Sequence, residues 1–375
     1  MANNTFYTNQ LITYLGNKRA LLPFINKVIV DILRKDYINI AREDIVMADL
    51  FSGSGVISRL MKTHAGILHV NDFEDYSEII NKCYLTNKND FNEAKFDELL
   101  PRVLNFKRNH TGIIRKNYSP KNDKLIEEDE RCFYTNENAI RIDTYRKAID
   151  KIVPEEMKKF FLAPLLYRAS VNVNTGGMFK GFYKDKKTKK GKFGGTNEDA
   201  LKRILKPITI EKPILSDFDS NVFIYKEDAN ELVKKLSKID IAYIDSPYNQ
   251  HPYGSNYFML NLILENKMPI SEISRVSGIP NNWKKSDYYK KGEALRAMDD
   301  LISSLDSKWV VVSYSSDGII KYDEMIDMLK KYGELEPIEA IDIDYNKLKS
   351  GRGSRQKEKK VKEYLFVLKK VMNDV

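Results

Sequence analysis

The chain contains few of the residues that build disulfide frameworks or metal centres. Its 375 residues include 2 cysteines and 4 histidines, and Cys83 and Cys132 lie far apart without the close spacing of a metal-binding pair. The histidines are equally scattered along the chain. The sequence therefore disfavours a disulfide-stapled secreted domain, and we expect a protein of a reducing cytoplasm that holds no metal.

The chain also lacks a long hydrophobic run. No stretch of about 18 apolar residues is present to span a bilayer, and residues 1–10 are polar, without the apolar centre of a signal peptide. We therefore expect no membrane partner and a cytoplasmic location.

Acidic residues are outnumbered by basic ones. The chain has 62 Lys and Arg against 53 Asp and Glu, a formal net charge of +9 and a pI near 9.1. Such an excess favours a polyanionic partner, because basic side chains that neutralise phosphates supply most of the non-specific affinity for nucleic acid. The length is sufficient for about two domains.

Apolar runs alternate with helical patterns through most of the chain, which predicts an α/β fold. Helical spacing appears at residues 21–33, 56–61, 155–169 and 231–236, whereas residues 91–217 lose the regular alternation and 176–195 have the composition of an exposed loop. The last two predicted strands are close enough to form a hairpin. We expect seven strands, at residues 45–51, 66–72, 222–225, 239–244, 309–314, 334–343 and 364–368.

A glycine-rich turn follows the first predicted strand, where residues 49–55 read Asp-Leu-Phe-Ser-Gly-Ser-Gly. Glycines there let the backbone approach a ligand closely. Ser58 occupies the third glycine position of a dinucleotide fingerprint, which disfavours a nicotinamide cofactor and an oxidoreductase. Asp72, at the tip of the next strand, is placed to bind ribose hydroxyls. The turn therefore favours a smaller adenosine ligand.

The segment Asp245-Ser246-Pro247-Tyr248 follows the apolar run 239–244. It places a carboxylate, a proline-stiffened turn and an aromatic ring at the carboxyl edge of a strand, where open α/β sheets bind ligands. These groups suit a planar substrate that carries an amine.

Together these segments resemble a known family. Phe51-x-Gly53-x-Gly55 and residues 245–248 resemble motifs I and IV of the S-adenosylmethionine-dependent DNA amino-methyltransferases, and residues 14–18, Tyr-Leu-Gly-Asn-Lys, resemble motif X. The order of motif X, motif I, an insertion and motif IV resembles the alpha group of adenine-N6 enzymes (D12 class, Dam-like). The resemblance covers about residues 12–90 and 220–370.

The resemblance implies a Rossmann-like, seven-stranded methyltransferase sheet, mostly parallel with a late antiparallel hairpin. Residues 1–90 and 218–375 would form the catalytic domain, and 91–217 an inserted target-recognition domain. It also implies S-adenosylmethionine as cofactor, with S-adenosylhomocysteine as product. The expected cofactor-binding residues are Tyr14, Lys18, Asp49, Phe51, Ser52, Gly53, Ser54, Gly55, Asp72, Asp228, Ala229 and Asp245.

Within that set, the family assigns the methionine end of the cofactor to the positions of Tyr14 and Lys18, and its adenine to that of Asp228. The expected catalytic residues are Asp245, Ser246, Pro247 and Tyr248. The family has proline at the second of these four positions, so Ser246 is a departure that puts the rate and fine geometry in question.

Asp245 and nearby backbone carbonyls would accept the two amine hydrogens of adenine and aim the nitrogen lone pair at the sulfonium methyl. Tyr248 would stack on the base, which must leave the duplex to be reached. A segment rich in Tyr and Asn, 249–261, either closes over this base or lines the edge of the sheet.

Two basic segments, 184–192 and 347–362, are expected to contact DNA phosphates. The predicted DNA-binding residues are Lys184, Lys186, Lys187, Lys189, Lys190, Lys192, Arg352, Arg355 and Tyr257. The candidates for reading bases are Asn172, Asn174, Lys180 and Lys184.

The expected partner is double-stranded DNA, in a restriction-modification system with a cognate endonuclease. The alternatives are methylation of cytosine N4 or of RNA adenine on the same fold, and a non-catalytic DNA-binding protein.

Overall fold

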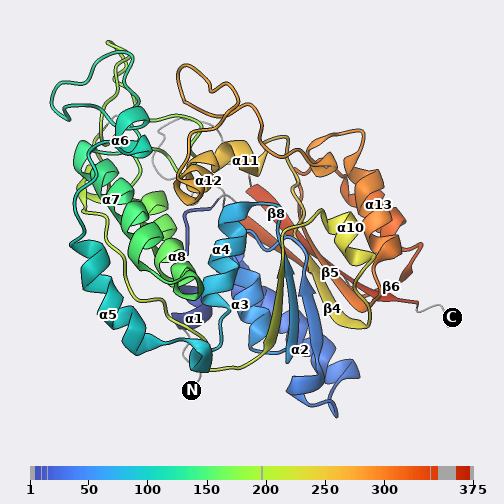
Figure 1. The fold of residues 1–375 in the computed structure, drawn as a ribbon. Helices are drawn as coiled ribbons and strands as arrows, with labels where there is room; N and C mark the ends of the chain where they lie inside the picture. The colour runs from blue at the N-terminus through green and yellow to red at the C-terminus, as the bar shows by residue number, and fades with distance from the viewer. Residues whose placement is uncertain are drawn as a thin grey trace.

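The computed structural model describes residues 5–9, 11–14, 16–195, 197–337, 339–344 and 360–371. Two regions lie side by side in Figure 1, a sheet with its flanking helices and a group of helices drawn mostly in teal and green. The strands are β1 (Val46–Asp49), β2 (Ile67–Asn71), β3 (Asn221–Tyr225), β4 (Ile239–Ile244), β5 (Ser307–Ser315), β6 (Gly333–Leu335), β7 (Glu339–Asp344) and β8 (Lys360–Lys370).

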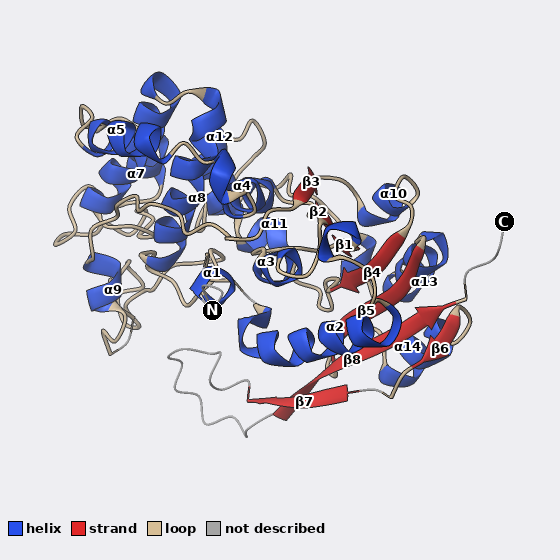
Figure 2. Ribbon diagram, turned by 90° about the horizontal axis from the view of Figure 1, so that it is seen from below, coloured by secondary structure: helices blue, strands red, loops and turns tan. Residues whose placement is uncertain are grey.

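All of these strands belong to one sheet, in the order β3-β2-β1-β4-β5-β8-β6, with β7 also pairing with β8 (Figure 2). The first five strands pair in parallel, and β8 is antiparallel to β5, β6 and β7. The order reverses direction between β1 and β4, so the carboxyl ends of these two strands flank the crevice where such sheets bind ligands. The predicted α/β class and the late antiparallel hairpin are confirmed.

The predicted strand at 334–343 is two strands, β6 and β7, which both pair with the same edge of β8. Pro337 lies in the gap between them. Proline has no backbone N–H to donate to the ladder, which accounts for the break. The described part of the chain thus has eight strands instead of the seven expected.

Helices cover both faces of the sheet because alternate strand residues point to opposite faces. Trp309 and Val311 of β5 pack toward α2 (Leu22–Asp36) and α3 (Val56–Lys62). Val310 and Val312 pack toward the other layer. That layer consists of α10 (Ala229–Val233), α13 (Ala294–Ser304) and α14 (Tyr322–Leu329).

The described part of the segment 91–217, predicted as an insertion, contains five helices, whereas the sequence periodicity identified only one of them, at residues 155–169. It contains α5 (Glu93–Leu104), α6 (Ile113–Asn117), α7 (Asn136–Ile152), α8 (Glu155–Val171) and α9 (Leu201–Leu205). Its apolar core is continuous with residues of α4 (Asp75–Tyr84) and α12 (Phe258–Glu265), which lie outside the predicted insertion. The division at 90/91 and 217/218 stays a prediction.

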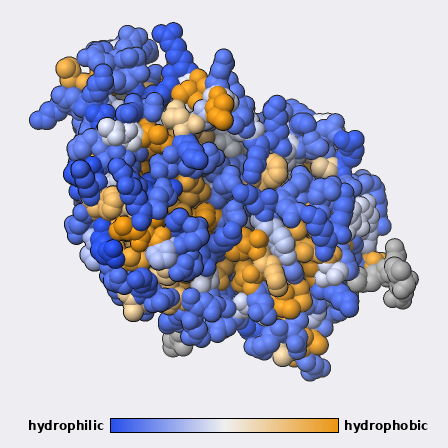
Figure 3. All heavy atoms as spheres, viewed as in Figure 1, coloured by the Kyte–Doolittle hydropathy of each residue, from blue (hydrophilic) through white to orange (hydrophobic). Residues whose placement is uncertain are grey.

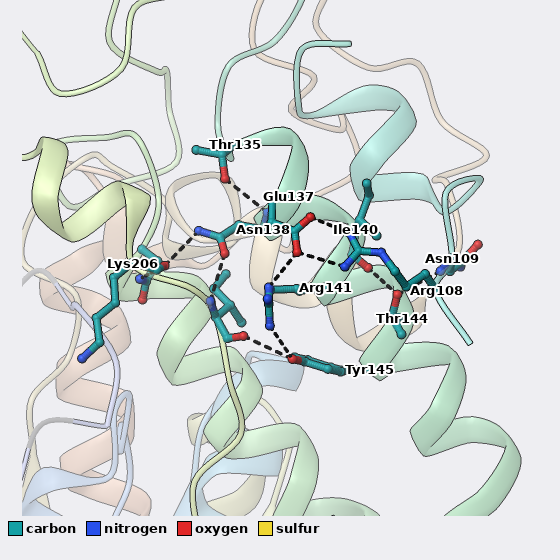
Figure 4. Close-up of polar contacts among 12 residues, drawn as sticks. Arg108, Asn109, Thr135, Glu137, Asn138, Ile140, Arg141, Thr144, Tyr145 and Lys206 are labelled. Atoms are coloured by element: carbon teal, nitrogen blue, oxygen red, sulfur yellow. Dashed lines mark hydrogen bonds and ion pairs between the residues drawn. The ribbon is translucent and has the colours of Figure 1, made fainter. Parts of the chain in front are cut away.

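Helix α7 holds two irregular segments against this helical region (Figure 4). Glu137 binds both Arg108 and Arg141, and Thr144 Oγ1 accepts a hydrogen bond from the Asn109 N–H at 2.9 Å. On the other side, the Asn138 side chain donates to the Lys206 carbonyl at 3.1 Å. The loops that follow α5 and α9 are thus fixed to one helix.

Short helical turns complete the described chain: α1 (Thr5–Thr8), η1 (Lys18–Leu21), η2 (Arg42–Asp44), η3 (Lys88–Asp90), α11 (Tyr253–Asn256) and η4 (Asp287–Tyr289). No described helix is long and apolar enough to cross a membrane. Both cysteines are buried and unbridged.

Candidate active site

The glycine turn links the end of β1 to α3 and has the backbone conformation that glycine allows. Gly53 and Gly55 have φ of +50° and +73°, in the left-handed region that side chains disfavour. A Cβ atom on Gly53 would lie 2.8 Å from the Tyr14 ring. The Ser77 hydroxyl donates to the Gly53 carbonyl at 2.7 Å and so holds the turn from α4. The turn is therefore tight, and the Tyr14 ring packs directly against it.

A pocket opens over this turn. It contains about 860 Å³ of space, part of it open to solvent. Every predicted cofactor-binding residue except Gly55 lines it. Gly55 lies just beneath, as the N-cap of α3. The fold thus brings together segments that are more than 200 residues apart in the sequence.

The pocket wall is rich in carboxylates although the chain as a whole is basic. The acidic residues that line it are Asp49, Asp72, Glu74, Glu227, Asp228 and Asp245, whereas Lys18 is the one basic residue among the lining side chains of the described chain. Such a wall favours a ligand that carries positive charge.

Asp72 is fixed by two backbone hydrogen bonds. Its carboxylate accepts from the Gly53 N–H at 2.7 Å and from the Glu74 N–H at 2.9 Å. Each oxygen retains a lone pair that can accept from a ligand hydroxyl. Across the pocket, Asp228 caps α10 by accepting from the Asn230 N–H at 2.9 Å.

Asp49 has one hydrogen-bonded oxygen and one free acceptor. Its Oδ2 accepts from the Ser58 hydroxyl at 2.5 Å, whereas Oδ1 is buried and has no hydrogen-bond partner in the described chain. Burial raises the pKa of Asp49 to about 7. An unpaired buried acceptor is costly, so this atom marks a position where a ligand donor fits.

Asp245 lies at the end of β4 and is paired with a buried lysine. The Lys18 ammonium is 3.2 Å from the Asp245 carboxylate and also contacts Glu363 of β8. Burial raises the pKa of Asp245 to about 7, against the lowering effect of Lys18. The two carboxylates outweigh the burial of Lys18 and hold its pKa well above the usual value, so Lys18 stays charged.

The other three residues of the segment 245–248 differ in their access to the pocket. Pro247 lines it, whereas Ser246 and Tyr248 are 1% and 7% exposed and do not. The Tyr248 ring packs edge-on against Tyr314 at 6.0 Å. In this conformation the Tyr248 ring is part of the core beneath the pocket.

Three tyrosine rings form a stack beside the glycine turn. Tyr14 lies nearly parallel to Tyr253 at 5.1 Å and to Tyr257 at 4.9 Å. Tyr14 and Tyr253 line the pocket, but Tyr257 is fully buried. The structure therefore places Tyr257 behind the pocket wall, away from any surface that DNA reaches in this conformation, and its DNA contact stays a prediction.

A segment that carries no recognised motif closes one side of the pocket. Ser286, Tyr288 and Tyr289, in and just before η4, are among the lining residues. The Tyr288 ring meets Phe51 edge-on at 5.2 Å. Sequence reasoning did not identify these residues, and only the tyrosine pair distinguishes the segment from an ordinary loop.

Four lysines of the segment 184–192 are exposed. The end of the molecule where α6 lies in Figure 1 is largely hydrophilic in the same view in Figure 3. Asp185 fixes this turn by accepting from the Lys187 and Thr188 backbone N–H groups at 2.9 and 2.8 Å. Lys190 and Lys192 are half-buried and pair with Glu127 and Glu198. The exposed lysines are Lys184, Lys186, Lys187 and Lys189.

The candidate base-reading residues have a different outcome. Asn172 and Asn174 are 1% and 0% exposed and bind backbone carbonyls, for example that of Cys132, so neither reaches the surface in this conformation, and base reading by them stays a prediction. Lys180 is exposed. Arg352 and Arg355 lie outside the described residues. No group of three or more potential metal ligands occurs within the described ranges.

The reversed strand order, the glycine turn and the acidic strand ends are features of α/β domains that bind nucleoside cofactors. A model of the family described as D12 class N6 adenine-specific DNA methyltransferase matches residues 14–328, and the chain belongs to this family.

Several curated relatives match this chain over 95% or more of its length. Type II methyltransferase M.NlaIII of Neisseria lactamica is 27% identical, over 96% of this chain and 99% of the relative. Type II methyltransferase M.CviAII of Paramecium bursaria Chlorella virus 1 is 30% identical, over 95% and 97%. Modification methylase StsI of Streptococcus sanguinis is 28% identical, and the match covers 95% of this chain but only 52% of that relative. This chain therefore spans the whole of some relatives and about half of others.

Proposed function

We propose that the protein transfers a methyl group from S-adenosylmethionine to N6 of an adenine flipped out of double-stranded DNA, as the modification enzyme of a restriction-modification system. The observation that carries this proposal is the position of Asp245 at the edge of an acid-rich pocket, in a chain of the D12 class family. We infer that the same pocket holds the cofactor and admits the base.

The residues of the pocket fit the cofactor. S-adenosylmethionine carries a sulfonium and an ammonium group, and the carboxylates around the pocket suit both. The unpaired Asp49 Oδ1 can accept a hydrogen bond from the ammonium, and the second lone pairs of Asp72 can accept from ribose hydroxyls. Phe51 and Tyr288 offer ring surfaces for the adenine.

When bound, the cofactor supplies an electrophilic methyl group. Asp245 and the adjacent backbone carbonyls accept the amine hydrogens of the base, which localises the nitrogen lone pair and orients it for direct attack. Positioning of this kind lowers a barrier by up to about 7–11 kcal/mol in well-oriented intramolecular systems. Asp245 must be ionised to do so, and the Lys18 ion pair favours that form.

The exposed lysines of 184–192 and the half-buried Tyr253 support the remaining parts of the proposal. The lysines would neutralise backbone phosphates. Tyr253 lines the pocket on the segment that follows residues 245–248, where its ring would meet an incoming base. Whether residues 91–217 act as the target-recognition domain is part of the same proposal.

The test is methylation of plasmid DNA by the purified protein, followed by single-molecule sequencing and mass analysis of the nucleosides. We expect N6-methyladenine at one short motif. Asp245→Ala should abolish it with cofactor binding largely retained, whereas Asp31→Ala, at an exposed ion pair with Lys27 on α2, should be fully active.

N4-methylcytosine in place of N6-methyladenine would change the assigned base. Cofactor binding without any DNA product would favour an RNA substrate or a non-catalytic binder.

A further inference from the structure

Glu363 is a buried carboxylate outside the pocket that no motif identified. It is 3% exposed and lies on β8, opposite Ser315 of β5 in the antiparallel register. The Ser313 hydroxyl donates to its Oε1 at 2.7 Å, and the same oxygen contacts the Lys18 ammonium. A charge this deep in a fold requires a partner, and Lys18 is that partner.

Lys18 is therefore shared between two carboxylates. Its ammonium contacts Glu363 on one side and lies 3.2 Å from Asp245 on the other, 5.3 Å from the centre of the Tyr248 ring. Lys18 is 4% exposed, so water screens these interactions little. One ammonium group therefore lies between two carboxyl groups.

This sharing affects how well Asp245 accepts a hydrogen bond. The like charge of Glu363 raises the pKa of Asp245, in the same direction as the larger effect of burial, whereas Lys18 lowers it. Among the described residues, Asp49, Tyr243 and Tyr253 also interact electrostatically with this cluster. Without the Glu363 charge, Lys18 would neutralise Asp245 alone and make it a weaker acceptor.

We propose that Glu363 is a positioning residue, which holds Lys18 between two carboxylates and so keeps Asp245 oriented and basic enough to accept the amine hydrogen of the target base. This inference rests on the proposed function, because it concerns the group that prepares the amine. Glu363 touches neither substrate and acts through Lys18.

The test is Glu363→Gln, which keeps the shape of the side chain and removes its charge. We expect the affinity for S-adenosylmethionine to stay within about twofold and kcat for DNA methylation to fall by about tenfold, since efficiency follows the basicity of the acceptor. The acid limb of the pH profile should move to lower pH. Glu336→Gln is the matched control, because Glu336 pairs with Lys35 at the surface.

A direct readout does not depend on activity. Titration of protein labelled with ¹³C at aspartate, with Asp245→Asn to assign the signal, should show the pKa of Asp245 lowered by about 1 in Glu363→Gln. If Glu363→Gln does not fold, Ser313→Ala removes the hydroxyl that fixes Glu363 and should shift the same signal by less, in the same direction.

An unchanged Asp245 titration in a folded variant would overturn the proposal, as would a loss of activity without any change in the pH profile. If the wild-type protein methylates no DNA, but the pKa of Asp245 is still lower in Glu363→Gln than in wild type, the result would count against the proposed function alone. The electrostatic link between Glu363 and Asp245 would then stand.

Discussion

Replacing Gly53 with alanine tests the glycine turn beneath the proposed cofactor pocket. The added Cβ would lie 2.8 Å from Cε1 of Tyr14, closer than real Cβ atoms approach, and φ of +50° at this position disfavours any L side chain. The backbone or the ring must move. Tyr14 lines the pocket and is stacked on Tyr257, so a shift of the ring changes the pocket wall.

The two effects have separate magnitudes. Left-handed strain costs about 1–2 kcal/mol of folding free energy, which lowers Tm by about 1–3 °C in a chain of this size. If displacement of Tyr14 costs the bound state a similar 1–2 kcal/mol, the affinity for S-adenosylmethionine falls by about 5–30-fold.

The assay is calorimetric titration of S-adenosylmethionine, with thermal unfolding measured on the same samples. Gly292→Ala is the control, because its Cβ would meet nothing within 4 Å, and it should leave both affinity and Tm unchanged. A folded Gly53→Ala protein that binds the cofactor as tightly as wild type would refute the reasoning and show the turn to be structural only.

Other parts of the site lead to three further predictions. The acid limb of kcat/KM should have an apparent pKa near 7, because Asp245 is protonated below that pH and then no longer accepts with both oxygens; a flat profile through neutral pH would contradict this. Tyr288→Leu should weaken S-adenosylmethionine binding by about tenfold without changing DNA affinity, since the ring borders Phe51. Calorimetry measures the first affinity and a DNA-binding titration the second. A loss confined to DNA affinity would assign the ring to DNA binding instead. Alanine at the exposed lysines should reduce the slope of log affinity against log salt by about 1 for each DNA phosphate that is no longer neutralised. Alanine at Lys190 and Lys192, which are paired with glutamates, should change the slope less. A slope equal to that of wild type in the first variant would show that the loop does not contact DNA phosphates.

The pocket proposed to hold the cofactor was the part most accessible to prediction. Gly53 and Gly55 were identified because a turn that needs positive φ and close approach leaves few choices of residue. Asp72 and Asp245 were identified because the carboxyl ends of parallel strands meet at one edge of a sheet, so local strand prediction is enough to bring them together.

Residues that act through long-range packing could not be identified in this way. Glu363 is one carboxylate in a lysine-rich strand, and only the pairing of β8 with β5 brings it to Lys18. Asn172 and Asn174 had the right chemistry for reading bases, but packing against neighbouring backbone carbonyls buries both. Tyr257 likewise stacks on Tyr14 inside the fold.

The sequence by itself determined the α/β class, the late hairpin and the family, because short motifs and strand periodicity are local properties of the chain. The tertiary structure decided how the acidic residues surround one pocket, how one lysine serves two carboxylates, and which aromatic rings face a ligand. These depend on burial and on contacts between residues hundreds of positions apart, such as Lys18 and Glu363, which no local pattern encodes.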